Sequence, residues 1–178
     1  MRGLLYALAA VVLSLATRAY AGDGGSLNVT STEFADGAAI PSQYTCQGSG
    51  VSPPIFWSAV PPDTQSIAVI VDDPDAPGGT FEHLALFDLP PSEPSLPSLG
   101  ASPAGTEGTV ARNSSGGVGF APICPPSGQH HYRFQVLALD KTIALPNGVS
   151  SAAVSRAMSG HVLARGLLTG VYQKSAAK

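Results

Sequence analysis

One short segment of this sequence is typical of a strand in the middle of a sheet. Ser66–Val71, with the sequence SIAVIV, is rich in β-branched and apolar residues and shows no alternation with polar ones. A strand that is apolar on both faces has to be covered on both faces. The following residues, 72–79 (DDPDAPGG), suit neither a strand nor a helix, because proline and glycine interrupt both. We therefore expect a buried central strand that ends in a stiff acidic turn.

The rest of the chain predicts a mainly β protein. Residues 131–139 alternate, which places Tyr132, Phe134, Val136 and Ala138 on one face of a strand and the intervening residues on the other. Further strands are expected at 27–34, 55–57, 83–89 and 167–173. One helix is expected to begin at Ser150 or Ser151 and to end at Gly166, because apolar residues recur there at three-to-four spacing, namely Val154, Ala157, Met158, His161 and Val162. The 20 glycines and 16 prolines among 178 residues indicate long loops within one domain, residues 90–108 among them.

The first 21 residues are typical of a secretory signal peptide. Arg2 precedes an apolar run from Leu4 to Leu15, and Ala19-Tyr20-Ala21 is a small-x-small cleavage site. The apolar run is shorter than the roughly 20 residues of a membrane span, so the alternative of an uncleaved membrane anchor is disfavoured. We expect a mature domain of residues 22–178 without a membrane span, in the periplasm or secreted.

The mature part contains two cysteines, Cys46 and Cys124. In an oxidising compartment two thiols usually pair, and a disulfide closing so long a loop would stabilise the fold by roughly 3–5 kcal/mol. The alternative is two buried thiols. Charge excludes another class of partner: the net charge is −3, and no cluster of lysine and arginine could neutralise nucleic-acid phosphates.

Three stretches could carry binding chemistry. Asp73 and Asp75 lie in the proline-stiffened turn, and His83 follows at the start of the next expected strand. His130 and Tyr132 are two residues apart, so they share a face of their strand. Two imidazoles, a phenol and nearby backbone N–H groups would form a pocket for a small anion. The alternatives are an ordinary turn and structural histidines, and His131, on the opposite face, is expected to be structural.

Several runs of sequence together resemble the phosphatidylethanolamine-binding protein family, which includes the Raf kinase inhibitor proteins, and in particular its bacterial branch. The runs are SPPIFW (52–57), SIAVIVDDPDAPGG (66–79), EHLALFDLP (82–90), GGVGFAPICPPSGQHHYRFQVLALD (116–140) and AMSGHVLARGLLTGVY (157–172). The resemblance implies a large antiparallel sheet packed on a smaller sheet, with a C-terminal helix. It also implies an anion pocket lined by Asp73, Pro77, His83, Pro125, His130 and Tyr132, with Asp75 supporting the turn.

The leading hypothesis is therefore an exported binding protein, without a cofactor and not an enzyme. Its ligand would carry a phosphate, as a phospholipid head group, a phosphorylated small molecule or a phosphopeptide, and regulation of a partner protein is a further expectation of the resemblance. One alternative is a metal-dependent hydrolase using Asp73, Asp75, His83 and His130, although no HExxH or GxSxG motif is present. Another is a protease inhibitor or interaction protein that acts through the 90–108 loop.

Overall fold

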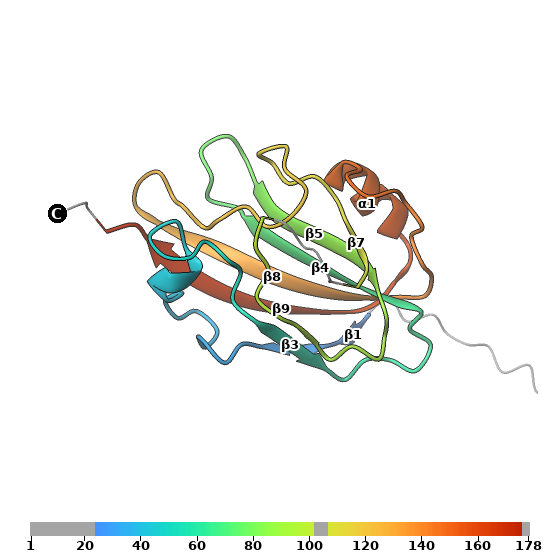
Figure 1. Ribbon diagram of the computed structural model, residues 1–178. Coiled ribbons are helices and arrows are strands. Elements are labelled where there is room, and N and C mark those ends of the chain that lie inside the picture. The colour runs from blue at the N-terminus through green and yellow to red at the C-terminus, as the bar shows by residue number, and fades with distance from the viewer. Residues whose placement is uncertain (1–23, 102–106, 176–178) are drawn as a thin grey trace, which may run out of the picture.

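The computed structural model describes residues 24–101 and 107–175, so the expected signal peptide lies outside the described residues. A six-stranded sheet has the order β1-β9-β8-β4-β5-β7, and a three-stranded sheet has the order β2-β3-β6. Figure 1 shows the long strands β4, β5, β8 and β9 side by side, with α1 at one end of them. The elements are β1 (Gly25–Ser26), β2 (Asn28–Thr30), a 3-10 turn (Ser42–Tyr44), β3 (Ile55–Ser58), β4 (Ser66–Asp73), β5 (Phe81–Leu89), β6 (Ser95–Leu96), β7 (Thr109–Val110), β8 (Gln129–Leu139), α1 (Ser151–Met158) and β9 (Val162–Gln173).

Strand β4 is covered on both faces, as its sequence predicts. Ile67, Val69 and Val71 belong to the main core, which fills the space between the two sheets. Ala68 lies on the opposite face, in a second cluster to which α1 contributes Val154 and other apolar residues. The long strands pair antiparallel with one another. The large sheet is mixed, however, because the short edge strand β1 pairs parallel with β9.

Strand β8 shows the predicted alternation. Tyr132, Phe134, Val136 and Ala138 point into the main core, whereas Leu137 lies in the second cluster. Register with β4 on one side and β9 on the other holds the whole strand in place. His130 and Tyr132, at the start of β8, therefore share a face of the strand, as expected.

The helix is shorter than its sequence pattern predicts. Ser150 caps it as expected, accepting a hydrogen bond from the N–H of Ala153, but the helix ends at Met158. Gly160 then adopts a left-handed φ of +80°, and β9 begins at Val162. The prediction that Gly166 ends the helix is wrong. Gly166 lies inside β9, where a Cβ would come within 2.5 Å of the Val29 side chain and 2.6 Å of the Leu27 carbonyl oxygen.

The expected loop 90–108 is partly attached to the fold. Its residues Ser95 and Leu96 form β6, which pairs with β3, and Leu96 and Leu99 are buried. Residues 102–106 lie outside the described residues.

The expected disulfide is present. Cys46 and Cys124 are bonded, with their Cα atoms 5.4 Å apart and a separation of 78 positions in sequence. The bond joins the loop after the 3-10 turn to the segment that precedes β8.

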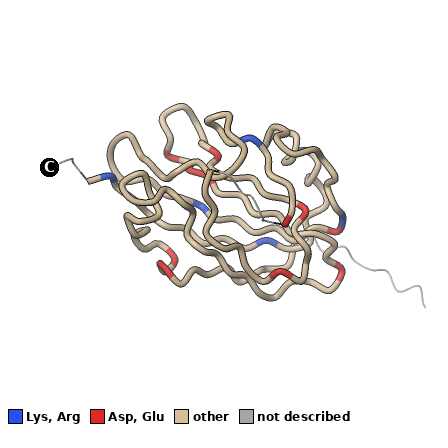
Figure 2. The backbone as a smooth tube through the Cα atoms, in the orientation of Figure 1, with Lys and Arg blue, Asp and Glu red and all other residues tan. Residues whose placement is uncertain are grey.

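Charged residues are sparse over the described chain. Figure 2 shows its lysines and arginines scattered singly over the backbone. In the part of the chain that the structure describes, no helix has the length and apolar character needed to cross a membrane.

The close approach at Gly166 can be tested by Gly166→Ala. The added methyl group would collide with Val29 and the Leu27 backbone, so we expect a loss of about 1–3 kcal/mol in the free energy of unfolding, measured by urea denaturation. Gly78→Ala is the matched control, because nothing lies within 4 Å of its Cβ position and its φ is not left-handed. Equal stability of the two variants would contradict this packing.

Candidate functional site

A pocket of about 320 Å³ lies where the end of β4 meets the starts of β5 and β8. The antiparallel order β8-β4-β5 brings these three strand ends to one edge of the large sheet. The turn after β4 and the segment before β8 complete the walls. The lining residues are Asp73, Ala76, Pro77, Phe81, His83, Ser115, Ala121, Pro122, Cys124, Pro126 and Tyr132.

A β-bulge directs His83 into this pocket. Val71 of β4 pairs with Leu84, and the next residue, Asp72, pairs with Glu82, so His83 is the extra residue of β5. Bulges of this kind re-aim a side chain next to a functional site. The imidazole lies only 4% exposed among aromatic rings, with centroids 4.8 Å from Phe81 and 5.4 Å from Tyr132.

The hydrogen bonds of His83 fix which ring nitrogen carries the proton. Nδ1 lies 2.8 Å from the carbonyl oxygen of Ala121, which can only accept, so Nδ1 must donate. The N–H of Ala121 in turn donates to the carbonyl of His83 over 2.9 Å. The other ring nitrogen, Nε2, is buried and has no partner.

The imidazole of His83 is held in its neutral form. Burial lowers the pKa of His83 below its ordinary value, because a charged ring would lose its hydration. The hydrogen bond to Ala121 and the charges of Asp73 and Asp72 act in the opposite direction but are smaller effects. In the neutral ring with a proton on Nδ1, Nε2 is a hydrogen-bond acceptor.

Tyr132 provides a second buried polar atom without a partner. Its side chain is fully buried at the start of β8, and its hydroxyl makes no hydrogen bond. Burial raises the pKa of Tyr132 well above its ordinary value, and the charges of Asp73 and Asp75 act in the same direction, so the hydroxyl keeps its proton. A buried polar group without a partner costs about 1–3 kcal/mol, and such exceptions in folded proteins need an explanation. A polar ligand would supply one.

The carboxylate of Asp73 also lines the pocket, but both of its oxygens have partners. Oδ1 accepts from the N–H of Asp75 over 2.8 Å, and Oδ2 lies 2.7 Å from Nδ1 of His130. Asp73 is therefore held by its own turn on one side and by β8 on the other.

Asp75 lies outside the pocket. Its Oδ2 accepts from the N–H of His131 over 2.8 Å and lies 2.7 Å from the Nδ1 of the same residue. The two hydrogen bonds from His131 lower the pKa of Asp75. Both side chains are exposed, and their contact fastens the turn to β8. This position agrees with a supporting role for Asp75.

The structure brings four of the seven predicted ligand-binding residues to the pocket wall: Asp73, Pro77, His83 and Tyr132. His130 reaches the pocket only through Asp73, Asp75 is a support, and Pro126 lines the wall where Pro125 was expected. Phe81, Ser115 and Ala121 also line the pocket, but the sequence analysis did not predict them as ligand-binding residues. Phe81 stands two residues before His83, which is a signal for it, but Ala121 acts through its backbone carbonyl, which no side-chain pattern reveals.

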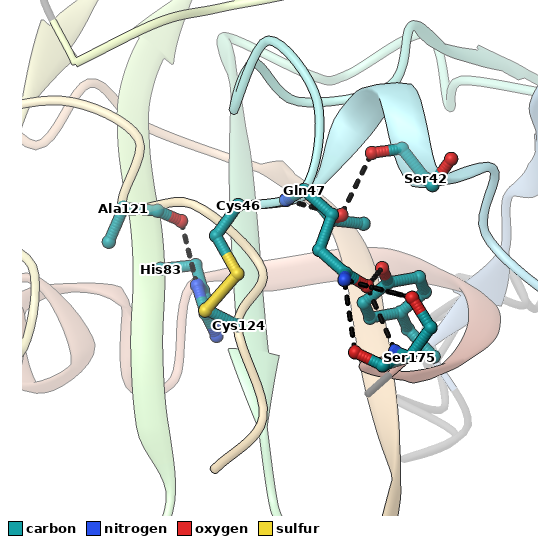
Figure 3. The surroundings of a disulfide bond; sticks show 9 residues. Ser42, Cys46, Gln47, His83, Ala121, Cys124 and Ser175 are labelled. Carbon is teal, nitrogen blue, oxygen red and sulfur yellow. Dashed lines mark hydrogen bonds between the residues drawn. A yellow bond between two sulfur atoms is a disulfide. The ribbon is translucent and has the colours of Figure 1, made fainter. Parts of the chain in front are cut away.

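The disulfide forms part of the wall. Cys124 lines the pocket, and Cys46, its partner, donates its backbone N–H to the carbonyl of Ile123 over 2.9 Å. Figure 3 shows the disulfide beside the hydrogen bond between His83 and Ala121. On the far side, Gln47 binds Ser175 near the end of the described chain. The wall segment is thus held both by His83 and by the Cys46 loop.

The same geometry bears on the metal hypothesis. Within residues 24–101 and 107–175, no group of three or more histidine, cysteine, aspartate or glutamate side chains could hold a metal ion. Nδ1 of His83 is committed to a carbonyl oxygen, and Nδ1 of His130 is committed to Asp73. Asp75, which is paired with His131 outside the pocket, is not gathered with Asp73, His83 and His130 into such a group.

Comparison with known proteins gives a consistent result. The sequence profile of the phosphatidylethanolamine-binding protein family matches residues 30–173. A UPF0098 protein of Methanothermobacter thermautotrophicus is 41% identical over 152 residues, which is 83% of this chain and 99% of the relative. LppC of Mycobacterium tuberculosis, named as a lipoprotein, is 37% identical over 83% of this chain and 72% of its own length.

Two solved structures are similar to this one. A phosphatidylethanolamine-binding protein homologue of Chlamydia trachomatis, CT736, has a TM-score of 0.79 and 35% identity, covering 85% of this chain and 99% of that one. YbcL of Escherichia coli, described as a member of the mammalian phosphatidylethanolamine-binding protein family, has a TM-score of 0.78 and 32% identity, covering 85% and 100%.

Two tyrosines allow a test of the unpartnered hydroxyl. Tyr132→Phe removes a buried polar atom without a partner, so we expect the free energy of unfolding to stay the same or to rise by about 1 kcal/mol. Tyr172→Phe is the comparison, because the Tyr172 hydroxyl donates to Gln47, and its loss should cost about 1 kcal/mol. Chemical denaturation measures both values, and destabilisation by Tyr132→Phe as large as that by Tyr172→Phe would contradict the assignment.

Glu82, next to the bulge, predicts a pH dependence of stability. Burial raises the pKa of Glu82 from 4.5 to about 7, and the charge of Asp72 adds to this effect. The folded state thus binds the proton more tightly than the unfolded state, so stability should fall as pH rises from 4.5 to about 7. Because the side chain is partly exposed, we expect Glu82→Gln to recover only about 1 kcal/mol above that range and nothing below it. Denaturation at several pH values measures this, with exposed Glu107→Gln as the control; equal pH profiles for Glu82→Gln and the wild type would contradict it.

Proposed function

Because the chain belongs to the phosphatidylethanolamine-binding protein family, we propose that it is an exported binding protein whose pocket holds a small phosphate-bearing ligand. The observation that carries the proposal is the pair of buried polar atoms without partners in one pocket, Nε2 of His83 and the hydroxyl of Tyr132. The Tyr132 hydroxyl could donate to a ligand oxyanion, and Nε2 of His83 could accept from a ligand O–H. Binding is the function for which this arrangement is suited.

The walls suit a ligand with a small polar head and an apolar neighbour. The rim is apolar, with Pro77, Phe81, Pro122 and Pro126 around the polar groups. Such a site, mostly apolar with a few convergent polar groups, is typical of small-molecule binding. The rigid proline-rich walls would reduce the entropy lost on binding.

Export is the second part of the proposal. Two observations support export. Disulfides such as that between Cys46 and Cys124 form and persist in oxidising compartments, and one relative is named as a lipoprotein. We propose cleavage after Ala21 and a location in the periplasm or outside the cell. N-terminal sequencing of the protein from fractionated cells should find Gly22 as the first residue.

Ligand binding can be tested by titration calorimetry and thermal shift. Phosphoethanolamine and inorganic phosphate should stabilise the protein, by about 2.7 kcal/mol at a hundredfold excess over Kd, whereas acetate and divalent metals should have smaller effects. His83→Asn keeps a donor for the Ala121 carbonyl and removes Nε2, so it should weaken phosphoethanolamine binding at least about tenfold with little change in stability.

His161→Asn is the matched control. His161 lies far from the pocket in the chain, and its side chain is partly exposed and paired with Asp140. Its substitution should leave phosphoethanolamine affinity unchanged. Equal affinities of His83→Asn and the wild type, or no stabilisation by any phosphate compound, would overturn the proposal.

A further inference from the structure

The two unpartnered polar groups that line the pocket, on Tyr132 and His83, have a definite hydrogen-bonding pattern. Tyr132 offers one O–H donor, because burial keeps its proton in place. His83 offers one acceptor at Nε2, because Nδ1 donates its proton to the carbonyl of Ala121 and burial favours the neutral ring by lowering its pKa. A complementary ligand must therefore accept one hydrogen bond and donate another at neighbouring positions.

The charged and titratable groups around His83 are mostly acidic. Asp73 and Asp72 of β4 act on its imidazole, and Tyr132 of β8 lies edge-on to it. On its own strand Glu82 is adjacent, while His130 of β8 is bound to Asp73. The remaining rings in contact belong to phenylalanines.

No permanent cation among the described lining residues balances the acidic groups of the pocket. The described residues that line the pocket include neither lysine nor arginine. Arg133 is near in sequence, but it lies on the opposite face of the sheet and forms two hydrogen bonds, of 2.7 and 2.8 Å, to Asp72. A doubly charged phosphate would thus enter a low-dielectric site beside a carboxylate with no fixed positive partner, which is unfavourable.

We propose that the pocket takes phosphate monoesters in their singly protonated form and discriminates against phosphodiesters. A monoester with one P–O–H and one P–O⁻ can donate to Nε2 of His83 and accept from the Tyr132 hydroxyl. The phosphate of a diester, including that of a phospholipid head group, has no P–O–H, so it cannot donate to Nε2. This inference rests on the proposed function, since it specifies the form of phosphate that the same pocket accepts.

The proposal implies that a proton accompanies the ligand. The second pKa of a phosphate monoester is about 6, so above that pH the free ligand is mainly a dianion. On binding, one proton from solvent is held between the phosphate oxygen and Nε2, and no bond to phosphorus forms or breaks. The lowered pKa of His83 is consistent with this, because the empty pocket does not already hold that proton.

Titration calorimetry with two related ligands tests the proposal. Phosphoethanolamine is a monoester, and glycerophosphoethanolamine carries the same ammonium group on a diester. At about pH 6 the monoester should bind at least about tenfold more tightly, since the phosphate of the diester cannot donate to Nε2. Monoester affinity should then fall about tenfold between about pH 7 and about pH 8. Repeating the titration in two buffers of different ionisation enthalpy should reveal uptake of about one proton per ligand at about pH 8.

Variants assign the effect to His83. His161→Asn should keep the ligand preference and the proton uptake of the wild type. His83→Asn should lose both, so that the two ligands bind it with similar, weaker affinity.

The outcomes separate this inference from the proposed function. Equal wild-type affinities for the two ligands, tighter binding of the diester, or equal binding heats in both buffers would overturn the inference while leaving phosphate binding intact. Tighter diester binding would identify the lipid head group as the source of the phosphate. If neither ligand nor inorganic phosphate binds at any of these pH values, the proposed function fails together with the inference.

Discussion

The pair of hydrogen bonds between His83 and Ala121 determines most of what this pocket can do. The imidazole donates to the carbonyl of Ala121, and the N–H of Ala121 donates back to the carbonyl of His83. Together they hold the wall before β8 against the bulge in β5, while the disulfide holds the same wall from the other side. They also fix the tautomer of the imidazole, which leaves Nε2 as an acceptor in the pocket. Shape and hydrogen-bonding pattern thus have one cause.

Much of the fold follows from local sequence patterns, because those patterns report on one strand and its two faces. The apolar run of β4 and the alternation of β8 predict their positions correctly. The helix end and the start of β9 were mispredicted, because Gly166 is needed for contact with Leu27 and Val29, more than 130 residues earlier in the chain. Local periodicity contains no information about that contact.

The same division applies to the site. Asp73, His83 and Tyr132 are recognisable from their motifs and lie together on the wall of one pocket. The bulge that aims His83 depends on the register between two strands, and the carbonyl of Ala121 has no sequence signature. Family resemblance supplied the residues, but it did not supply the tautomer or the absence of a lysine or arginine among the described lining residues. Those features come from packing, and they determine which ligands can fit.

Nitrogen-15 NMR of the His83 ring in the ligand-free protein tests the central claim most directly. The account predicts a neutral ring near neutral pH, with the proton on Nδ1 and a lone pair on Nε2, since a carbonyl oxygen faces Nδ1. Addition of a phosphate monoester should then move the Nε2 signal toward the protonated or strongly hydrogen-bonded range while Nδ1 changes little. A ring with its proton on Nε2, or an Nε2 signal unaffected by a saturating ligand, would contradict the account.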